Sequence, residues 1–189
     1  GIDFANTIVE TDSFNILTDE YIFNGGGLAI ADFDNNGLPD VFFTGNQVSN
    51  KLYLNQGKFK FKDISAEAGI EAGDRWCTGT TAVDINQDGL MDIYVAEAMM
   101  RGDGERDNLL FVNQGVNADG VVTFKEMAAQ YGIADSGNGM GAAFIDYDLD
   151  GDLDLYVLNN EQSKVTPSNY REKITDGSAI NNDAFYRNN

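Results

Sequence analysis

One nine-residue acidic string occurs three times in the chain and limits the available folds more than any other feature. The copies are DFDNNGLPD at residues 32–40 (loop 1), DINQDGLMD at residues 84–92 (loop 2) and DYDLDGDLD at residues 146–154 (loop 3). Each copy has oxygen-bearing side chains at positions 1, 3, 5 and 9 and a glycine at position 6. Alternate side chains in such a segment turn toward a common centre, and the glycine permits the sharp turn that wraps the chain around a hard cation. The sequence therefore predicts three metal-binding loops.

We expect each loop to bind one Ca²⁺, because this ion takes about six to eight oxygen ligands in loops of this kind. The expected ligands are the side chains at positions 1, 3, 5 and 9 and the backbone carbonyl at position 7. They are Asp32, Asp34, Asn36, Leu38 and Asp40 in loop 1, Asp84, Asn86, Asp88, Leu90 and Asp92 in loop 2, and Asp146, Asp148, Asp150, Asp152 and Asp154 in loop 3. Loop 3 has four carboxylates among the four side-chain positions and the other loops have three each, so loop 3 is predicted to bind most tightly.

The residues that flank the loops predict strands and exclude an EF-hand, in which the loop joins two helices and ends on a bidentate Glu at position 12. Position 12 lies within a run of aliphatic and aromatic residues of high strand propensity, and it is Phe43, Val95 and Val157 in the three loops. A glycine followed by small and apolar residues precedes each loop, and these glycines are Gly27, Gly79 and Gly141. Each loop is therefore expected to join two strands.

The repeat extends beyond the loops into a unit of four short strands. The first aspartates of successive loops lie 52 and 62 residues apart, and an Asn-Gln-Gly string in each of the first two units leads into a further strand. Four strands at this period predict an all-β fold, a β-propeller whose blades stack radially and protect each other's edges. We expect blade 1 at residues 24–73, blade 2 at residues 74–137 and an incomplete blade 3 at residues 138–189, about two and a half blades in all.

The two ends of the sequence suggest how such a ring would close. The third unit stops before its fourth strand, so we expect the chain to be a piece of a longer protein with further blades. Within the N-terminal segment (residues 1–23), the stretch at residues 4–8 repeats the pattern of the expected fourth strands at residues 61–64 and 124–127. We therefore expect the N-terminal segment to supply a ring-closing strand.

The loop followed directly by a strand resembles the FG-GAP/VCBS repeat, the calcium-loop blade of integrin α-type propellers. The resemblance covers roughly residues 24–189 and is greatest to bacterial surface proteins of the VCBS-repeat or ASPIC/UnbV type, although the literal FG and GAP strings are absent. It implies a calcium-stabilised propeller that binds another molecule, and it does not imply which one.

The composition excludes several classes of chemistry. The chain has no His, which excludes imidazole-based triads and zinc–histidine sites, and its pI near 4.1 excludes the basic surface that nucleic acids require. Glutamates outside the loops leave a glycosidase-type carboxylate pair open, but nothing in the sequence brings two of them together. The single cysteine, Cys77, is expected to be a small buried hydrophobic residue. We therefore expect no catalytic residues and no enzymatic activity.

Two segments that interrupt the repeat, residues 98–107 and residues 160–182, are the expected binding regions, since function in repeat folds often lies in insertions. The second insertion is relatively basic within an acidic chain and carries residue types that are common at binding hot spots, among them Lys164, Tyr170, Arg171 and Lys173. A disordered loop is the open alternative for this insertion.

The leading hypothesis is a calcium-binding module that binds a protein or a glycan, or the remaining blades of its own protein, at the cell surface. The alternatives are an accessory part of a carbohydrate-active enzyme and a structural subunit of an envelope complex. No apolar run approaches the ~18 residues of a membrane-spanning helix. Because the sequence starts at Gly1 and not at Met, a signal peptide or lipid anchor upstream is compatible with it, and an extracytoplasmic location is expected.

Overall fold

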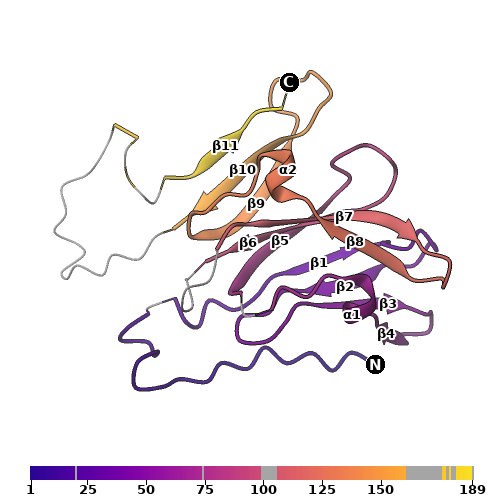
Figure 1. Cartoon of the computed structure of the whole chain (residues 1–189), viewed down its shortest axis with the longest axis horizontal. Coiled ribbons are helices and arrows are strands. Elements are labelled where there is room, and N and C mark those ends of the chain that lie inside the picture. The colour runs from indigo at the N-terminus through magenta and orange to yellow at the C-terminus, as the bar shows by residue number, and fades with distance from the viewer. Residues whose placement is uncertain are drawn as a thin grey trace.

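The computed structural model of the chain describes residues 1–19, 21–73, 75–98, 106–160, 176–177, 179 and 182–188. These residues form three antiparallel sheets, which confirms the predicted all-β class and is consistent with propeller blades (Figure 1). Sheet 1 contains β1 (Leu28–Ala31), β2 (Asp40–Phe43), β3 (Lys51–Asn55) and β4 (Phe61–Asp63) in this order. Sheet 2 contains β5 (Cys77–Val83), β6 (Asp92–Glu97), β7 (Leu109–Val116) and β8 (Val122–Glu126) in this order. Sheet 3 has the order β11 (Ala184–Tyr186), β10 (Asp154–Asn159) and β9 (Gly139–Ile145).

Two short helices, which were not predicted from the sequence, follow the fourth strands of sheets 1 and 2. They are α1 (Ser65–Ala68) and α2 (Ala128–Tyr131). Each ends at a glycine in the left-handed conformation, Gly69 with φ 74° and Gly132 with φ 71°, whose N–H caps the turn. A helix of four residues is too short to show an amphipathic period, so the glycines are its main sequence signal.

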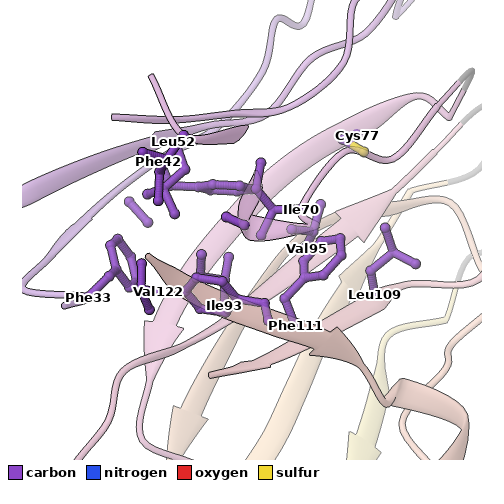
Figure 2. Packing of buried hydrophobic residues seen from close by; sticks show 14 residues of the cluster. Phe33, Phe42, Leu52, Ile70, Cys77, Ile93, Val95, Leu109, Phe111 and Val122 are labelled. Carbon is purple, nitrogen blue, oxygen red and sulfur yellow. The ribbon is translucent and has the colours of Figure 1, made fainter. Parts of the chain in front are cut away.

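Apolar side chains pack between successive sheets, which lie one after another in chain order (Figure 1). Figure 2 shows the core between sheets 1 and 2, where Phe33 and Phe42 face Ile93, Phe111 and Val122. The alternate residues of β6 and β7 face the other way, and they form a second core with sheet 3 that includes Tyr94, Leu110 and Val112. Sheet 2 therefore has a core on each of its faces.

The first strands of the three sheets are neighbours, with β1 against β5 and β5 against β9. Glycines make this close approach possible: a Cβ added at Gly27 would lie 2.6 Å from the carbonyl oxygen of Thr78, and one added at Gly79 would lie 2.5 Å from that of Met140. The Thr44 hydroxyl also donates a 2.6 Å hydrogen bond to the Thr78 carbonyl across the first contact. The recurrent glycine before each loop thus marks the place where one sheet meets the next.

The first ten residues form no strand and lie along sheet 1 (Figure 1). The Phe4 ring stacks on the Phe43 ring at a centroid distance of 4.9 Å, and the Tyr53 hydroxyl donates a 2.7 Å hydrogen bond to Asp3 Oδ1. The segment thus covers the face of sheet 1 that points away from sheet 2. Ring closure by this segment stays a prediction.

Candidate metal centres

Each acidic loop joins the first and second strands of its sheet, and the three loops share one backbone conformation. Position 1 follows the first strand directly, and position 9 is the first residue of the second strand, at Asp40, Asp92 and Asp154. Position 4 is left-handed in every loop, with φ values of 55° at Asn35, 57° at Gln87 and 62° at Leu149. The glycine at position 6 also has a positive φ, of 86° at Gly37, 84° at Gly89 and 97° at Gly151. The three copies of the acidic string therefore adopt the same backbone conformation.

The carboxylate at position 1 holds the turn of its own loop. In loop 1, Asp32 accepts hydrogen bonds from the backbone N–H groups of Asn36 (3.0 Å) and Gly37 (2.7 Å). In loop 2, Asp84 accepts the equivalent bonds from Asp88 (3.1 Å) and Gly89 (2.9 Å). In loop 3, Asp146 keeps the glycine bond, which is 3.2 Å long.

The side chain at position 5 holds the next turn, which contains the expected carbonyl ligand at position 7. Its side-chain oxygen accepts the backbone N–H of position 7 at 2.8 Å in loops 1 and 2 and at 3.1 Å in loop 3. The positions 5 are Asn36, Asp88 and Asp150, and the positions 7 are Leu38, Leu90 and Asp152. One oxygen of position 5 is therefore engaged within the loop.

Carboxylates converge in loops 1 and 3. One oxygen each of Asp32, Asp34 and Asp40 lie within 4.8 Å of one another, and the same holds for Asp146, Asp148 and Asp150. The three aspartates of loop 2, which are Asp84, Asp88 and Asp92, do not form such a group. Loop 2 differs because its position 3 is the amide Asn86, whose Nδ2 donates a 2.9 Å hydrogen bond to Asp88.

The carboxylate at position 9 is buried and ties the loop to the third strand of its sheet. Asp40 is fully buried, and its two oxygens accept the N–H groups of Phe33 (2.9 Å) and Asn55 (2.7 Å). Burial raises the pKa of Asp40 to about 6, and the nearby charges of Asp34 and Asp32 add to the increase while the two N–H groups oppose it. Burial likewise raises the pKa of Asp92.

The same two N–H contacts recur at position 9 of the other loops. Asp92 accepts the N–H groups of Ile85 at 3.1 Å and Asn113 at 2.7 Å. Asp154 accepts those of Tyr147 at 3.0 Å and Asn188 at 2.9 Å. This role of the three asparagines was not predicted from the sequence, although an Asn that recurs within or just after the third strand was a signal for it.

Loop 3 contains buried carboxylate oxygens that accept no hydrogen bond. The buried Oδ1 atoms of Asp146 and Asp148 have no hydrogen-bond partner. The other oxygen of Asp148 accepts a hydrogen bond from the guanidinium of Arg187, whose side chain is 57% exposed. Two buried carboxylate oxygens without a donor are the arrangement that a bound cation would satisfy.

Outside the loops, the described residues include a buried charged pair at the opposite end of β6. Glu97 is 1% exposed and lies 3.0 Å from the Arg75 guanidinium. Burial raises the pKa of Glu97 to about 7, and Arg75 opposes the increase. Cys77 lies beside it and is fully buried, as expected, and burial raises the pKa of its thiol. An ion pair and a buried protonated thiol form a structural cluster and not a nucleophilic site.

A cavity of about 430 Å³ lies between sheets 2 and 3. Its lining is mainly apolar and aromatic, including Ile85, Phe144 and Tyr186, and it contains no carboxylate side chain. The cavity therefore lacks the carboxylate pair of a glycosidase.

The two insertions expected to bind a partner fall mainly outside the described residues: only 98, 106–107, 160, 176–177, 179 and 182 of them are described. Among the helices within the described ranges, none has the length and apolar character needed to cross a membrane.

Comparison with known proteins agrees with the repeat. A family model described as "FG-GAP-like repeat" matches residues 17–95, a range that contains loops 1 and 2. Among curated proteins, the chain is 26% identical to cartilage acidic protein 1 of Xenopus tropicalis over 164 residues, which are 85% of this chain and 24% of that protein. It is 28% identical to the protein of the same name from Homo sapiens over 148 residues, 76% of this chain and 21% of that protein.

These similarities support an FG-GAP-like repeat within this chain. The chain spans about a quarter or less of the length of the curated relatives it matches. The whole-protein activities of those relatives therefore carry over only as proposals.

Proposed function

We propose that this chain is part of a calcium-stabilised β-propeller that serves as a binding or scaffolding module at the cell surface or outside the cell. The observation that carries the proposal is the shared geometry of the three acidic loops, two of which bring three carboxylates within 4.8 Å. Such carboxylates repel one another strongly, by roughly 4 kcal/mol per pair at 4 Å and an effective dielectric constant near 20. A divalent cation in each loop would remove this repulsion.

The residues present fit Ca²⁺. Their donors are all oxygens, and the two buried oxygens of loop 3 without partners, on Asp146 and Asp148, call for a positive charge at that point. The side chains at positions 1, 3, 5 and 9 and the carbonyl at position 7 would hold the ion. When bound, calcium would supply positive charge that fixes the connection between the first two strands of each sheet. This role is structural, since each loop already provides most of the ligands from its own residues.

Calcium binding to the intact chain tests the proposal. Isothermal titration calorimetry should give three sites, and EDTA should lower the melting temperature. With an affinity of about 10⁻⁴ M, as in extracellular modules, millimolar Ca²⁺ would add on the order of 1.4 kcal/mol per site. The triple variant Asp32→Asn, Asp84→Asn, Asp146→Asn is the matched control, because it keeps the shape of position 1 and removes its charge. Heat of binding that is undiminished in this variant, or a melting curve that EDTA leaves unchanged, contradicts the metal sites.

The exposed face of sheet 3 indicates that one partner of this chain is a further blade of the same kind. Gly141 has open space where Gly27 and Gly79 meet a neighbouring strand, and the large side chains of Tyr156, Leu158 and Phe185 are 40–47% exposed. On sheet 2 the equivalent face is covered by sheet 3. We expect the chain to associate with more of its own protein or with a partner through this face, which light scattering would detect. A monodisperse monomer contradicts this expectation.

The proposed ligand-binding role rests on the composition of the insertion at residues 160–182. Replacement of these residues by a short Gly/Ser linker should abolish binding of a protein or glycan partner and leave calcium affinity unchanged. Retained binding would place the ligand elsewhere on the ring. Glycan hydrolysis by the chain would favour the alternative of a carbohydrate-active enzyme.

A further inference from the structure

The three acidic loops are linked to one another by side chains that no loop needs for its own turn. Asn35, at position 4 of loop 1, donates a hydrogen bond of 3.2 Å from Nδ2 to the backbone oxygen of Gly89 in loop 2. Gln87, at position 4 of loop 2, donates the equivalent bond from Nε2 to the oxygen of Gly151 in loop 3, also at 3.2 Å. Position 4 of one loop therefore holds the glycine at position 6 of the next.

The glycine that receives this bond lies at the centre of its own loop. The N–H of Gly89 donates to the position 1 carboxylate of Asp84 at 2.9 Å, and its carbonyl accepts from Asn35. The next carbonyl along the chain belongs to Leu90, which is the expected backbone ligand of loop 2. Asn35 thus fixes the orientation of the Gly89–Leu90 peptide from outside the loop. Gln87 does the same for the peptide that follows Gly151.

The residue types at position 4 fit this role. The left-handed conformation there costs most non-glycine residues about 1 kcal/mol, and Asn tolerates it best. Gln87 adopts it as well, and its bond to Gly151 offsets part of the cost. Leu149, at position 4 of loop 3, has no donor and is 85% exposed. The series of bonds consequently runs from loop 1 to loop 2 to loop 3 and ends there.

We propose that Asn35 and Gln87 are positioning residues that couple calcium binding in each loop to the order of the next loop. This inference rests on the proposed calcium sites. An ion bound by positions 3 and 5 of a loop fixes the backbone of position 4 between them, so the side chain at position 4 orders the neighbouring peptide before that loop binds its own ion. Because coupling between binding sites is reciprocal, an ion in loop 2 also favours an ion in loop 1.

Nuclear magnetic resonance of the intact, ¹⁵N-labelled chain of 20.6 kDa tests the coupling loop by loop. The amides of Gly37, Gly89 and Gly151 each donate to the first carboxylate of their own loop, so their chemical shifts during a Ca²⁺ titration report the three loops separately. Asn35→Leu should raise the calcium concentration at the midpoint of Gly89 by about two- to ten-fold, the effect of one modest hydrogen bond. Gln87→Leu should do the same for Gly151.

Two controls separate positioning from general damage. Asn35→Gln should restore the wild-type midpoint of Gly89, because glutamine makes the equivalent bond in loop 2. Leu149→Ala should leave all three midpoints unchanged, since this residue links to no following loop in the described chain. Leucine itself is compatible with the backbone at this position, as Leu149 demonstrates.

The possible results are distinguishable. If Asn35→Leu shifts only Gly37, or shifts no glycine while the wild-type chain binds Ca²⁺, the coupling is wrong and the proposed calcium sites stand. If none of the three glycines of the folded wild-type chain responds to millimolar Ca²⁺, the calcium sites are wrong and the coupling falls with them.

Discussion

Sheets 2 and 3 have similar second strands in very different surroundings. All six residues of β6 are buried, whereas β10 alternates between buried residues and exposed ones after its first two positions. Tyr94 and Tyr156 occupy the same place after their loops, yet Tyr94 is fully buried and Tyr156 is 40% exposed. The difference shows that the burial of one face of a sheet comes from the sheet that follows it.

A single unit of this repeat therefore depends on the neighbouring sheets for its core. Ile93 and Val95 of β6 pack toward sheet 1, and Tyr94 packs toward sheet 3. In β10, the residues that pack toward sheet 2, Leu155 and Val157, are buried, while those on the other face are not. Substitutions at matched positions of the two sheets should accordingly have very different effects.

The largest expected difference is between Tyr94→Ala and Tyr156→Ala. Tyr94 packs edge-on against Phe144 at 5.6 Å, and its hydroxyl donates a 3.0 Å hydrogen bond to the Ile133 carbonyl. Its truncation should lower the free energy of unfolding by about 3–5 kcal/mol, as for other large buried aromatic residues. The loss at Tyr156 should stay below about 1 kcal/mol. Urea denaturation of both variants measures this, and equal losses would contradict the dependence of sheet 2 on sheet 3.

The second prediction concerns the pH dependence of stability. It compares position 14, counted with the first aspartate of each loop as position 1, which is Glu97 in sheet 2 and Asn159 in sheet 3. The pKa of Glu97 is raised from 4.5 to about 7 by burial, so the folded state holds this proton more tightly than the unfolded state does. Its contribution to stability is therefore fully present below about pH 4.5 and is lost as the pH rises to 7. Glu97→Gln, an amide like Asn159, should remove this loss.

Thermal melting in EDTA at pH 5 and pH 8 provides the measurement. The stability of Glu97→Gln relative to the wild type should increase toward pH 8, by about 3 kcal/mol as an upper bound. Other carboxylates cancel in this difference, because both proteins contain them. A difference that is the same at both pH values would show that Glu97 does not titrate in this range.

The third prediction uses the glycines between the first strands. A Cβ at Gly79 would lie 2.5 Å from the Met140 oxygen, while a Cβ at Gly141 would meet nothing within 4 Å. Gly79→Ala should lower stability by roughly 1–3 kcal/mol, because backbone atoms cannot move apart without opening the contact between β5 and β9. Gly141→Ala should be neutral or slightly stabilising. Chemical denaturation of the pair decides the matter, and a neutral Gly79→Ala would show that the two strands are not tightly packed.

Most of the architecture could be predicted from the sequence because the acidic string marks the same point of each unit. Strand-forming residues after Asp40, Asp92 and Asp154 and small residues before the loops were enough to predict the strands and the all-β class. The roles of Asn55 and Asn113 were not predicted, since their bonds to position 9 join residues that lie 15 and 21 positions apart and depend on the register of two strands.

Which carboxylates converge within each loop could not be predicted from the sequence either. Position 9 gathers with positions 1 and 3 in loop 1, whereas position 5 takes its place in loop 3, although all four side chains of loop 3 are carboxylates. Such differences depend on side-chain rotamers and on neighbours such as Arg187. The contacts that hold the N-terminal segment, the aromatic stack of Phe4 on Phe43 and the bond from Tyr53 to Asp3, were likewise not predicted, and its ring-closing role stays a prediction.

The smallest predicted effect compares loops 2 and 3 in their affinity for calcium. Loop 3 has one more carboxylate than loop 2 and two buried oxygens without a partner, so it should bind Ca²⁺ more tightly. In about 1 mM Ca²⁺, Asp146→Ala should therefore remove up to about 1.4 kcal/mol of calcium-dependent stability, and Asp84→Ala should remove less. Melting temperatures measured with calcium and with EDTA isolate the calcium-dependent part of the stability, because only the difference between the two conditions is compared.

Arg187 tests whether charge sets this order. Its guanidinium neutralises one oxygen of Asp148, and the equivalent residues of the other sheets, Leu54 and Val112, are aliphatic. If the density of negative charge determines affinity, Arg187→Leu should increase the calcium-dependent stabilisation of loop 3 and leave that of loop 2 unchanged. If Arg187→Leu weakens calcium binding, the arginine instead holds Asp148 in place for the ion. A larger loss for Asp84→Ala than for Asp146→Ala would show that neither the number of carboxylates nor their convergence ranks the loops.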